Sequence, residues 1–307
     1  MRPRNLIRPD QHNYRRPFAV PAPHGRDCGR VFRWLRAPFM AVVLAASSLA
    51  SAQDREDIKV AASHLEISAR EIADAYIDVA FGIPGSDAAP RDTLLRRNSE
   101  ARVAVVPWLL PSGLENLPAA ERLYDRLGEI VDDINSHAEK PTALDLLSPA
   151  EVTAFLSEPV STERSANSVL FYIGSRPDIQ STVQRYGAQF PWISEPYDRF
   201  VKSPDSAARQ FCGTYVTQNP AAPAEAGFAL VFMEFGTDFD QCLYRLLLQS
   251  FGLLYGAKQD DSIFSPDAAR RNPSDLDWLI WRIHTGDVTT VGADRDKTSS
   301  TIVEVLR

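Results

Sequence analysis

The chain has 307 residues and a formal net charge of −7, with 33 Lys and Arg against 40 Asp and Glu. Residues 1–52 hold nine Arg, two Asp and no Lys, a net of +7, so residues 53–307 carry −14. Such an acidic chain is a poor nucleic-acid binder, because binding relies on neutralising phosphates with Lys and Arg. Anionic lipid surfaces also repel it. The composition therefore excludes nucleic-acid partners and favours a protein that works in aqueous solution.

Residues 31–52 have the pattern of a secretory signal peptide. Arg33 and Arg36 precede a run of apolar and small residues, and Ala50-Ser51-Ala52 matches an A-x-A cleavage signature. The predicted cut lies between Ala52 and Gln53. The apolar run is too short for a membrane span, which needs roughly 20 residues. We therefore predict a periplasmic or secreted protein whose mature chain has no stable membrane span.

The segment before the signal peptide, residues 1–30, is rich in Arg, Pro and His and has no apolar periodicity. A signal peptide normally begins near the start of a chain. We interpret residues 1–30 as a non-translated or disordered extension, with the true start near Val31 at a non-ATG codon. The alternative is an unusually long basic region in front of the signal.

Cysteine usage agrees with export. Cys28 lies upstream of the apolar run and is lost with the signal, which leaves Cys212 and Cys242. An even pair in an oxidising compartment indicates a disulfide. A closed loop of about 30 residues stabilises a fold by about 3–4 kcal/mol in the chain-entropy model. Two separate buried thiols are the alternative.

The expected elements alternate between helices and strands along the mature chain. We expect helices over about 69–81, 118–137, 149–157, 177–186, 239–255 and 275–284, and strands over 101–110, 168–175, 211–218 and 227–235. Capping boxes at Ser68–Glu71 and Ser148–Glu151, and a cap at Ser274, mark three helix starts. Pro107 restricts the first strand to a sheet edge or a strand end. Residues 188–210, rich in Pro, Asp and Ser, are interpreted as a surface excursion.

This order of elements predicts an α+β or mixed α/β fold, a small mixed sheet packed with helices. We find no internal repeat and no linker that would divide the chain. We therefore expect one globular domain over residues 53–292. A polar C-terminal tail follows over 293–307, with a helical pattern from Thr298.

Familiar catalytic motifs are missing from the sequence. It contains no H-E-x-x-H, G-x-S-x-G, P-loop, G-x-G-x-x-G or C-x-x-C. The histidines of the mature chain are His64, His137 and His284. Their positions at helix ends or on apolar faces are more typical of structural roles than of metal ligands. We therefore predict no cofactor.

Several segments together resemble a bacterial exported family known as domain of unknown function 2927. They read SANSVLFYIG, FCGTYV, DQCLYRLLLQSFGL, DDSIFSPD and LDWLIWRIHTGD, and the resemblance covers most of residues 65–292. Its most specific residues are Cys242, Gln249, Gly252, Leu253, Ser262, Ile263, Phe264 and Asp277. The two family cysteines fall on Cys212 and Cys242, so the resemblance also implies the disulfide.

The family helix after the second cysteine usually reads H-E-E-x-x-Q-x-x-G-L, which looks like the helix of a zinc peptidase. In that helix two side chains four residues apart face the metal, and an adjacent Glu activates water. The resemblance therefore implies a zincin-like fold. The matching positions here are Tyr244, Arg245 and Leu246, so no carboxylate remains as a base, and the permanent cation of Arg245 would repel a metal. Gln249 is left as a weak metal-ligand candidate, followed by a glycine stop at Gly252.

Three functional hypotheses follow from the sequence. The first is a non-catalytic, degenerate peptidase-like protein that binds a periplasmic protein or envelope component. The second is an atypical or metal-independent hydrolase with acids Glu234, Asp238 and Asp240 at a strand–helix junction. The third is a purely structural protein. The aromatic residues of two segments either form a binding surface or pack in the core; they are Phe190, Trp192, Tyr197, Phe200, Trp278 and Trp281.

Overall fold

A computed structural model describes most of residues 53–307. The described residues are 53–82, 91–97, 102–111, 117–138, 144–157, 167–188, 190–203, 206, 210–219, 222–235, 240–258, 262–265 and 272–307. All of them belong to one packed unit, Ser48–Arg307. The predicted extension over 1–30 and the signal peptide over 31–52 lie outside the described residues.

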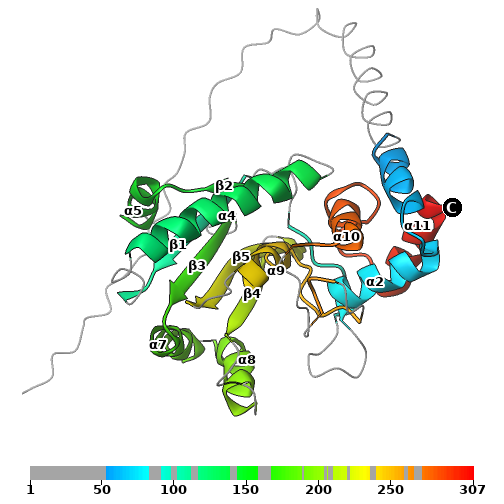
Figure 1. Ribbon diagram of the computed structural model, residues 1–307. Coiled ribbons are helices and arrows are strands. Elements are labelled where there is room, and N and C mark those ends of the chain that lie inside the picture. The colour runs from blue at the N-terminus through cyan, green and yellow to red at the C-terminus, as the bar shows by residue number, and fades with distance from the viewer. Residues whose placement is uncertain are drawn as a thin grey trace, which may run out of the picture. The chain divides into compact units, whose positions relative to one another are not determined.

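Within the described residues, five strands form a mixed sheet in the order β2-β1-β3-β5-β4 (Figure 1). The strands are β1 (Val103–Leu109), β2 (Leu144–Leu146), β3 (Ser168–Gly174), β4 (Cys212–Asn219) and β5 (Ala222–Glu234). Neighbouring pairs from β2 to β5 are parallel, and β4 pairs with β5 antiparallel at the edge. The predicted α+β fold with a small mixed sheet is therefore confirmed.

The central strand β3 shows why this sequence forms a covered sheet. Its residues SVLFYIG are buried except for a partly exposed Leu170. Parallel strands that have helices on both faces are continuous apolar runs, because both faces need burial. The neighbouring strand β5 is buried in the same way over its last residues, from Ala229 to Glu234.

The strand that contains Pro107 is an inner strand, and the prediction of an edge was wrong. β1 lies between β2 and β3, but β2 pairs with it only over Val103 to Val105. Ala104 and Leu110 donate their backbone N–H groups to the β3 side. Odd-numbered residues such as Pro107 therefore point their nitrogens to the other side, beyond the end of β2. The missing N–H of proline costs no ladder hydrogen bond there.

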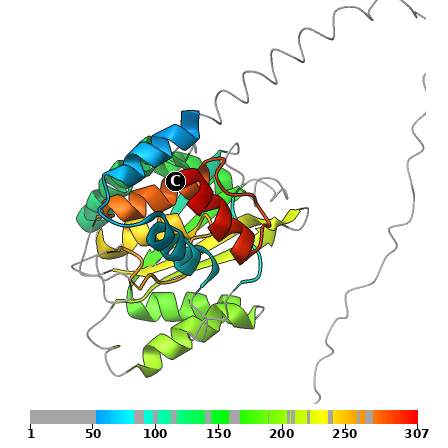
Figure 2. The ribbon, with the colours of Figure 1, turned by 90° about the vertical axis from the view of Figure 1, so that its right-hand side faces the viewer.

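Helices cover both faces of the sheet (Figure 2). Buried residues of α2 (Ala69–Phe81), α4 (Leu117–His137), α9 (Asp240–Gln249), α10 (Asp275–Thr285) and α11 (Arg295–Leu306) share one core cluster with one face. Residues of α7 (Arg176–Gly187) and α8 (Pro191–Lys202) form a second cluster with the opposite face. A short helix, α5 (Pro149–Ser157), follows β2.

Local capping signals place the helix starts where the sequence predicted them. Ser68 and Glu71 cap each other's backbone at the start of α2, and Ser274 and Asp277 do so at α10. Ser148 and Glu151 make the same exchange before α5. Each box satisfies N–H groups that have no partner inside the helix.

The segment 188–210 contains a helix, α8, so its interpretation as a surface excursion was wrong. Pro191 occupies the first turn, where a proline costs no hydrogen bond. Ile193 and Tyr197, one helical turn apart, are buried against the sheet, while Glu195 lies exposed between them. Asp198 is exposed as well, so the acidic residues belong to the outer face of an amphipathic helix.

The polar C-terminal tail expected over 293–307 is a packed helix along most of its length. α11 begins at Arg295, ahead of the helical pattern predicted from Thr298; it is capped by Asp294 and buries Ile302 completely in the main core. A further helix over residues 53–63 is anchored by the buried Ile58 and Ala62. The packed structure thus extends beyond residue 292.

Among the described residues, no helix is both long and apolar enough to cross a membrane.

Candidate functional site

The helix α9 contains the positions at which the family resemblance expects chemistry. Arg245 and Gln249 are four residues apart and both are partly exposed. Between them, Leu246, Leu247 and Leu248 have no exposed surface. The position expected for a water-activating carboxylate therefore holds a core leucine. The amide of Gln249 donates a hydrogen bond to the carbonyl of Leu254 at 3.4 Å.

Gly252 ends the turn after α9 in the predicted way. Its φ is +119°, a conformation that favours glycine. A Cβ atom at this position would lie 2.1 Å from the carbonyl oxygen of Leu95, so a side chain is excluded on space as well. The stop is a structural requirement of the packing between α9 and the 91–97 segment.

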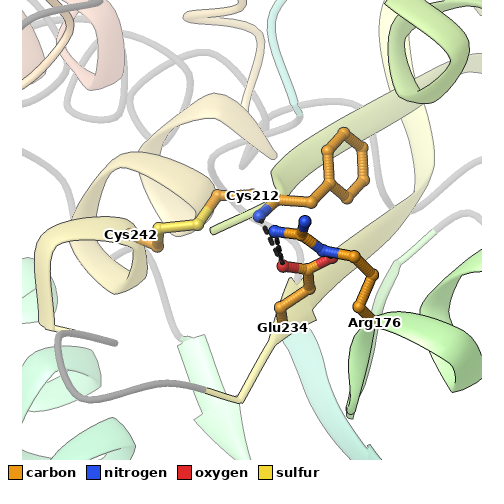
Figure 3. The surroundings of a disulfide bond; sticks show 5 residues. Arg176, Cys212, Glu234 and Cys242 are labelled. Atoms are coloured by element: carbon orange, nitrogen blue, oxygen red, sulfur yellow. Dashed lines mark hydrogen bonds and ion pairs between the residues drawn. A yellow bond between two sulfur atoms is a disulfide. The ribbon is translucent and has the colours of Figure 1, made fainter. Parts of the chain in front are cut away.

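The predicted disulfide between Cys212 and Cys242 is confirmed. It joins the start of the edge strand β4 to α9, with 6.0 Å between the two Cα atoms (Figure 3). A second tie lies two residues further along β4, where the Thr214 hydroxyl donates to the Leu246 carbonyl at 3.3 Å. Both links hold the edge strand beside the helix.

Glu234, a candidate acid, lies at the carboxyl end of β5 and is only 3% exposed. Arg176 at the start of α7 donates from Nε to Oε1 at 2.9 Å and from a terminal nitrogen to Oε2 at 3.1 Å (Figure 3). The backbone N–H of Phe211 also donates to Oε2 at 3.1 Å. The side-chain hydrogen bonds between Arg176 and Glu234 raise the pKa of Arg176. Both carboxylate oxygens are thus engaged in joining β5, α7 and the entry to β4.

Of the three candidate acids, Glu234 is the one whose side chain the structure describes. Asp238 lies outside the described residues. Only the backbone of Asp240 is described, at the start of α9. Ala52 is likewise outside them, whereas Gln53 is the first described residue and is exposed.

The three described histidines differ in their surroundings. His137 closes α4 and stacks on Trp278 with 4.0 Å between ring centroids. His64 is exposed, and His284 is fully buried. Over the described residues, no three His, Cys, Asp or Glu side chains gather in a way that could hold a metal ion.

The aromatic residues divide between core and surface. Tyr197 and Trp281 are buried, and the Trp281 indole donates to the Ile134 carbonyl at 3.1 Å. The Arg176 guanidinium lies over the ring of Phe200, with 5.4 Å between Cζ of Arg176 and the ring centroid. Phe190 is 43% exposed at the start of α8. Core packing therefore accounts for the two buried rings.

Open parallel sheets bind ligands at the carboxyl ends of strands where the connections change face. That point lies here between β1, followed by α4 on one face, and β3, followed by α7 on the other. A Cβ atom on Gly174 would lie 2.8 Å from the Cβ of Leu110. Leu110 therefore packs closely against the backbone of Gly174 at the carboxyl ends of β1 and β3.

A surface pocket of about 550 Å³ lies elsewhere, beside the helix over residues 53–63. Asp54 and Asp57 line it together with His64 and Arg282. Among the described residues that line this pocket, one was predicted from the sequence as a site residue: Gln53, at the predicted signal cleavage.

Sequence reasoning missed a buried polar group around Asp277. This carboxylate accepts hydrogen bonds from the Ser262 hydroxyl at 2.6 Å, the Ile263 N–H at 2.9 Å and the Ser274 N–H at 2.8 Å. The capping box with Ser274 is readable from spacing. Ser262 lies 15 residues before Asp277 in the chain, so local spacing carries no signal for this link.

Comparison of the chain with protein-family models, with curated proteins and with solved structures finds no match. The resemblance noted from the sequence segments stays a prediction.

Proposed function

We propose that the mature chain is an exported, non-catalytic protein that binds a periplasmic protein or envelope component on a degenerate peptidase-like scaffold. Export is supported by the signal-peptide pattern ending at Ala52 and by the disulfide between Cys212 and Cys242. The acidic charge of residues 53–307 argues against a nucleic-acid partner.

One observation carries the non-catalytic part of the proposal. On α9, the positions that would hold a metal ligand and its catalytic base are occupied by Arg245 and the fully buried Leu246. A guanidinium cannot be deprotonated to bind a cation, and a buried leucine cannot activate water. Compared with the family helix that it resembles, α9 has the disulfide, the apolar face and the glycine stop but not the metal ligand and the base.

Metal analysis of the purified, dialysed protein tests this proposal. We expect no stoichiometric zinc in the wild-type protein. The Gln249→Ala variant and the matched surface variant Gln180→Ala should give the same result. Stoichiometric zinc that is present in the wild type and lost only in Gln249→Ala would overturn the proposal.

The alternative is a hydrolase with acids at the strand–helix junction, favoured by the position of Glu234 at the end of β5, the strand that precedes α9 in the chain. Its Arg176 partner argues for a structural carboxylate instead. A broad hydrolase screen on Glu234→Gln, Asp238→Asn and Asp240→Asn tests it. We expect no hydrolysis from the wild type or from any of these variants, and Glu195→Gln is the control at an exposed residue. Hydrolysis by the wild type and by Glu195→Gln that is lost in the other three variants would support the hydrolase.

A further inference from the structure

The first described helix gives the predicted mature N-terminus a defined place. Residues 53–63 are helical, and Ile58 and Ala62 fix this helix in the main core. Gln53 itself is exposed and lines the pocket beside Arg282. Cleavage after Ala52 therefore makes Gln53 both the first residue of the chain and the first residue of an anchored helix.

We propose that Gln53 is a modification site, at which the new N-terminal glutamine cyclises to pyroglutamate after cleavage. This inference rests on the proposed export and signal cleavage. The unprotonated α-amino nitrogen attacks Cδ of its own side chain, forming a five-membered lactam. The bond from Cδ to Nε2 breaks, and the proton from the amine leaves with Nε2 as ammonia. The step is intramolecular and needs neither an oxidant nor a co-reactant.

The helix start accommodates this lactam. The ring constrains the same N–Cα bond that a proline ring constrains, and proline is favoured at the first helical position. The first N–H groups of a helix have no intrahelical partner, so the altered nitrogen breaks no ladder bond. The exposed first position leaves the side chain free to reach the amine.

Two opposing charges act on the amine at the helix start. The N-terminus of a helix carries partial positive charge, which disfavours a protonated amine and favours carboxylates. Asp54, Glu56 and Asp57 supply carboxylates in the first turn and a half, and these favour the protonated amine. Cyclisation removes the amine's positive charge and leaves these acids. The lactam also removes the free α-amine that aminopeptidases require.

The test is mass spectrometry and sequential N-terminal degradation of the mature protein, after export of the full chain from a bacterial host. The intact mass should be lower than that of Gln53–Arg307 by one ammonia, and the N-terminus should be blocked to degradation. Gln53→Ala should restore a free N-terminus. Gln180→Ala, which changes another exposed glutamine, should leave the block in place.

Two results would overturn the inference, and they are distinguishable. A mature chain that begins at Gln53 with a free amine contradicts cyclisation and leaves the proposed export intact. A first residue other than Gln53 contradicts the predicted cleavage site and the modification together.

Discussion

At the residue scale, the buried His284 shows how a titratable group becomes part of the core. Its Nδ1 lies 3.0 Å from the Tyr76 hydroxyl, and its Nε2 lies 3.1 Å from the Phe251 carbonyl. A carbonyl only accepts, so Nε2 carries the proton and Nδ1 accepts from Tyr76. The pKa of His284 is lowered to about 3, mainly by burial; the hydrogen bond to the Phe251 carbonyl opposes this shift, and the charge of Arg96 adds to it.

This pKa predicts an acid-sensitive fold. Below pH 6.5 His284 binds a proton in the unfolded chain, whereas in the folded protein it stays neutral down to about pH 3. The free energy of unfolding therefore falls as the pH is lowered from 6.5 to about 3. The free energy of unfolding should therefore drop by about 2–3 kcal/mol more between pH 6.5 and 4.5 in wild type than in His284→Gln. Urea unfolding at both pH values measures it. Parallel pH dependences would contradict the prediction, and the exposed His64→Gln should behave like wild type.

At the element scale, Asp277 joins α10 to the loop over residues 262–265. Its carboxylate accepts from Ser262, Ile263 and Ser274, and it is fully buried. Ser262, Ile263 and Asp277 are also among the residues that carry the family resemblance. The structure gives these residues a framework role, since they form hydrogen bonds that hold one helix start in place.

Asp277→Asn should reduce the free energy of unfolding by about 2–4 kcal/mol. The substitution places an NH₂ group among donors, which leaves buried N–H and O–H groups without acceptors, and weakens the cap. Asp275→Asn is the matched control, because Asp275 is exposed in the same first turn. Chemical denaturation of both variants gives the measurement. Equal stabilities for the two would show that the buried carboxylate contributes nothing specific.

At the scale of the whole molecule, the last helix completes the main core. The Thr93 and Asp294 backbones form an isolated bridge, and Arg295 donates a hydrogen bond to the Gly82 carbonyl at the end of α2. Ile302 is fully buried in the same cluster as the sheet. The C-terminal residues are therefore part of the cooperative unit.

Ile302→Ala should cost about 2–5 kcal/mol, the usual range for emptying a buried aliphatic site. Glu304→Ala, exposed on the same helix, should change stability by less than about 0.5 kcal/mol. Thermal and denaturant unfolding compare the two. An unfolding transition of Ile302→Ala equal to that of the wild type would contradict a contribution of α11 to the core.

The candidate site was only partly predictable. Spacing identified α9 and its glycine stop, because these features lie within a few residues of one another. The partner of Glu234 was not predictable, because Arg176 lies 58 residues earlier in the chain. The same holds for His284 and Tyr76, which are 208 residues apart.

The sequence by itself determined most of the helices and strands, and the disulfide. Helix caps, apolar periodicity and a single remaining cysteine pair are local or compositional signals, and they need no knowledge of the fold. Only the tertiary structure decided that Pro107 lies in an inner strand, that α8 and α11 pack onto the core, and that Glu234 and Asp277 are held by distant donors. The physical reason is that these outcomes depend on which faces meet in space, and a local pattern of residues does not encode that.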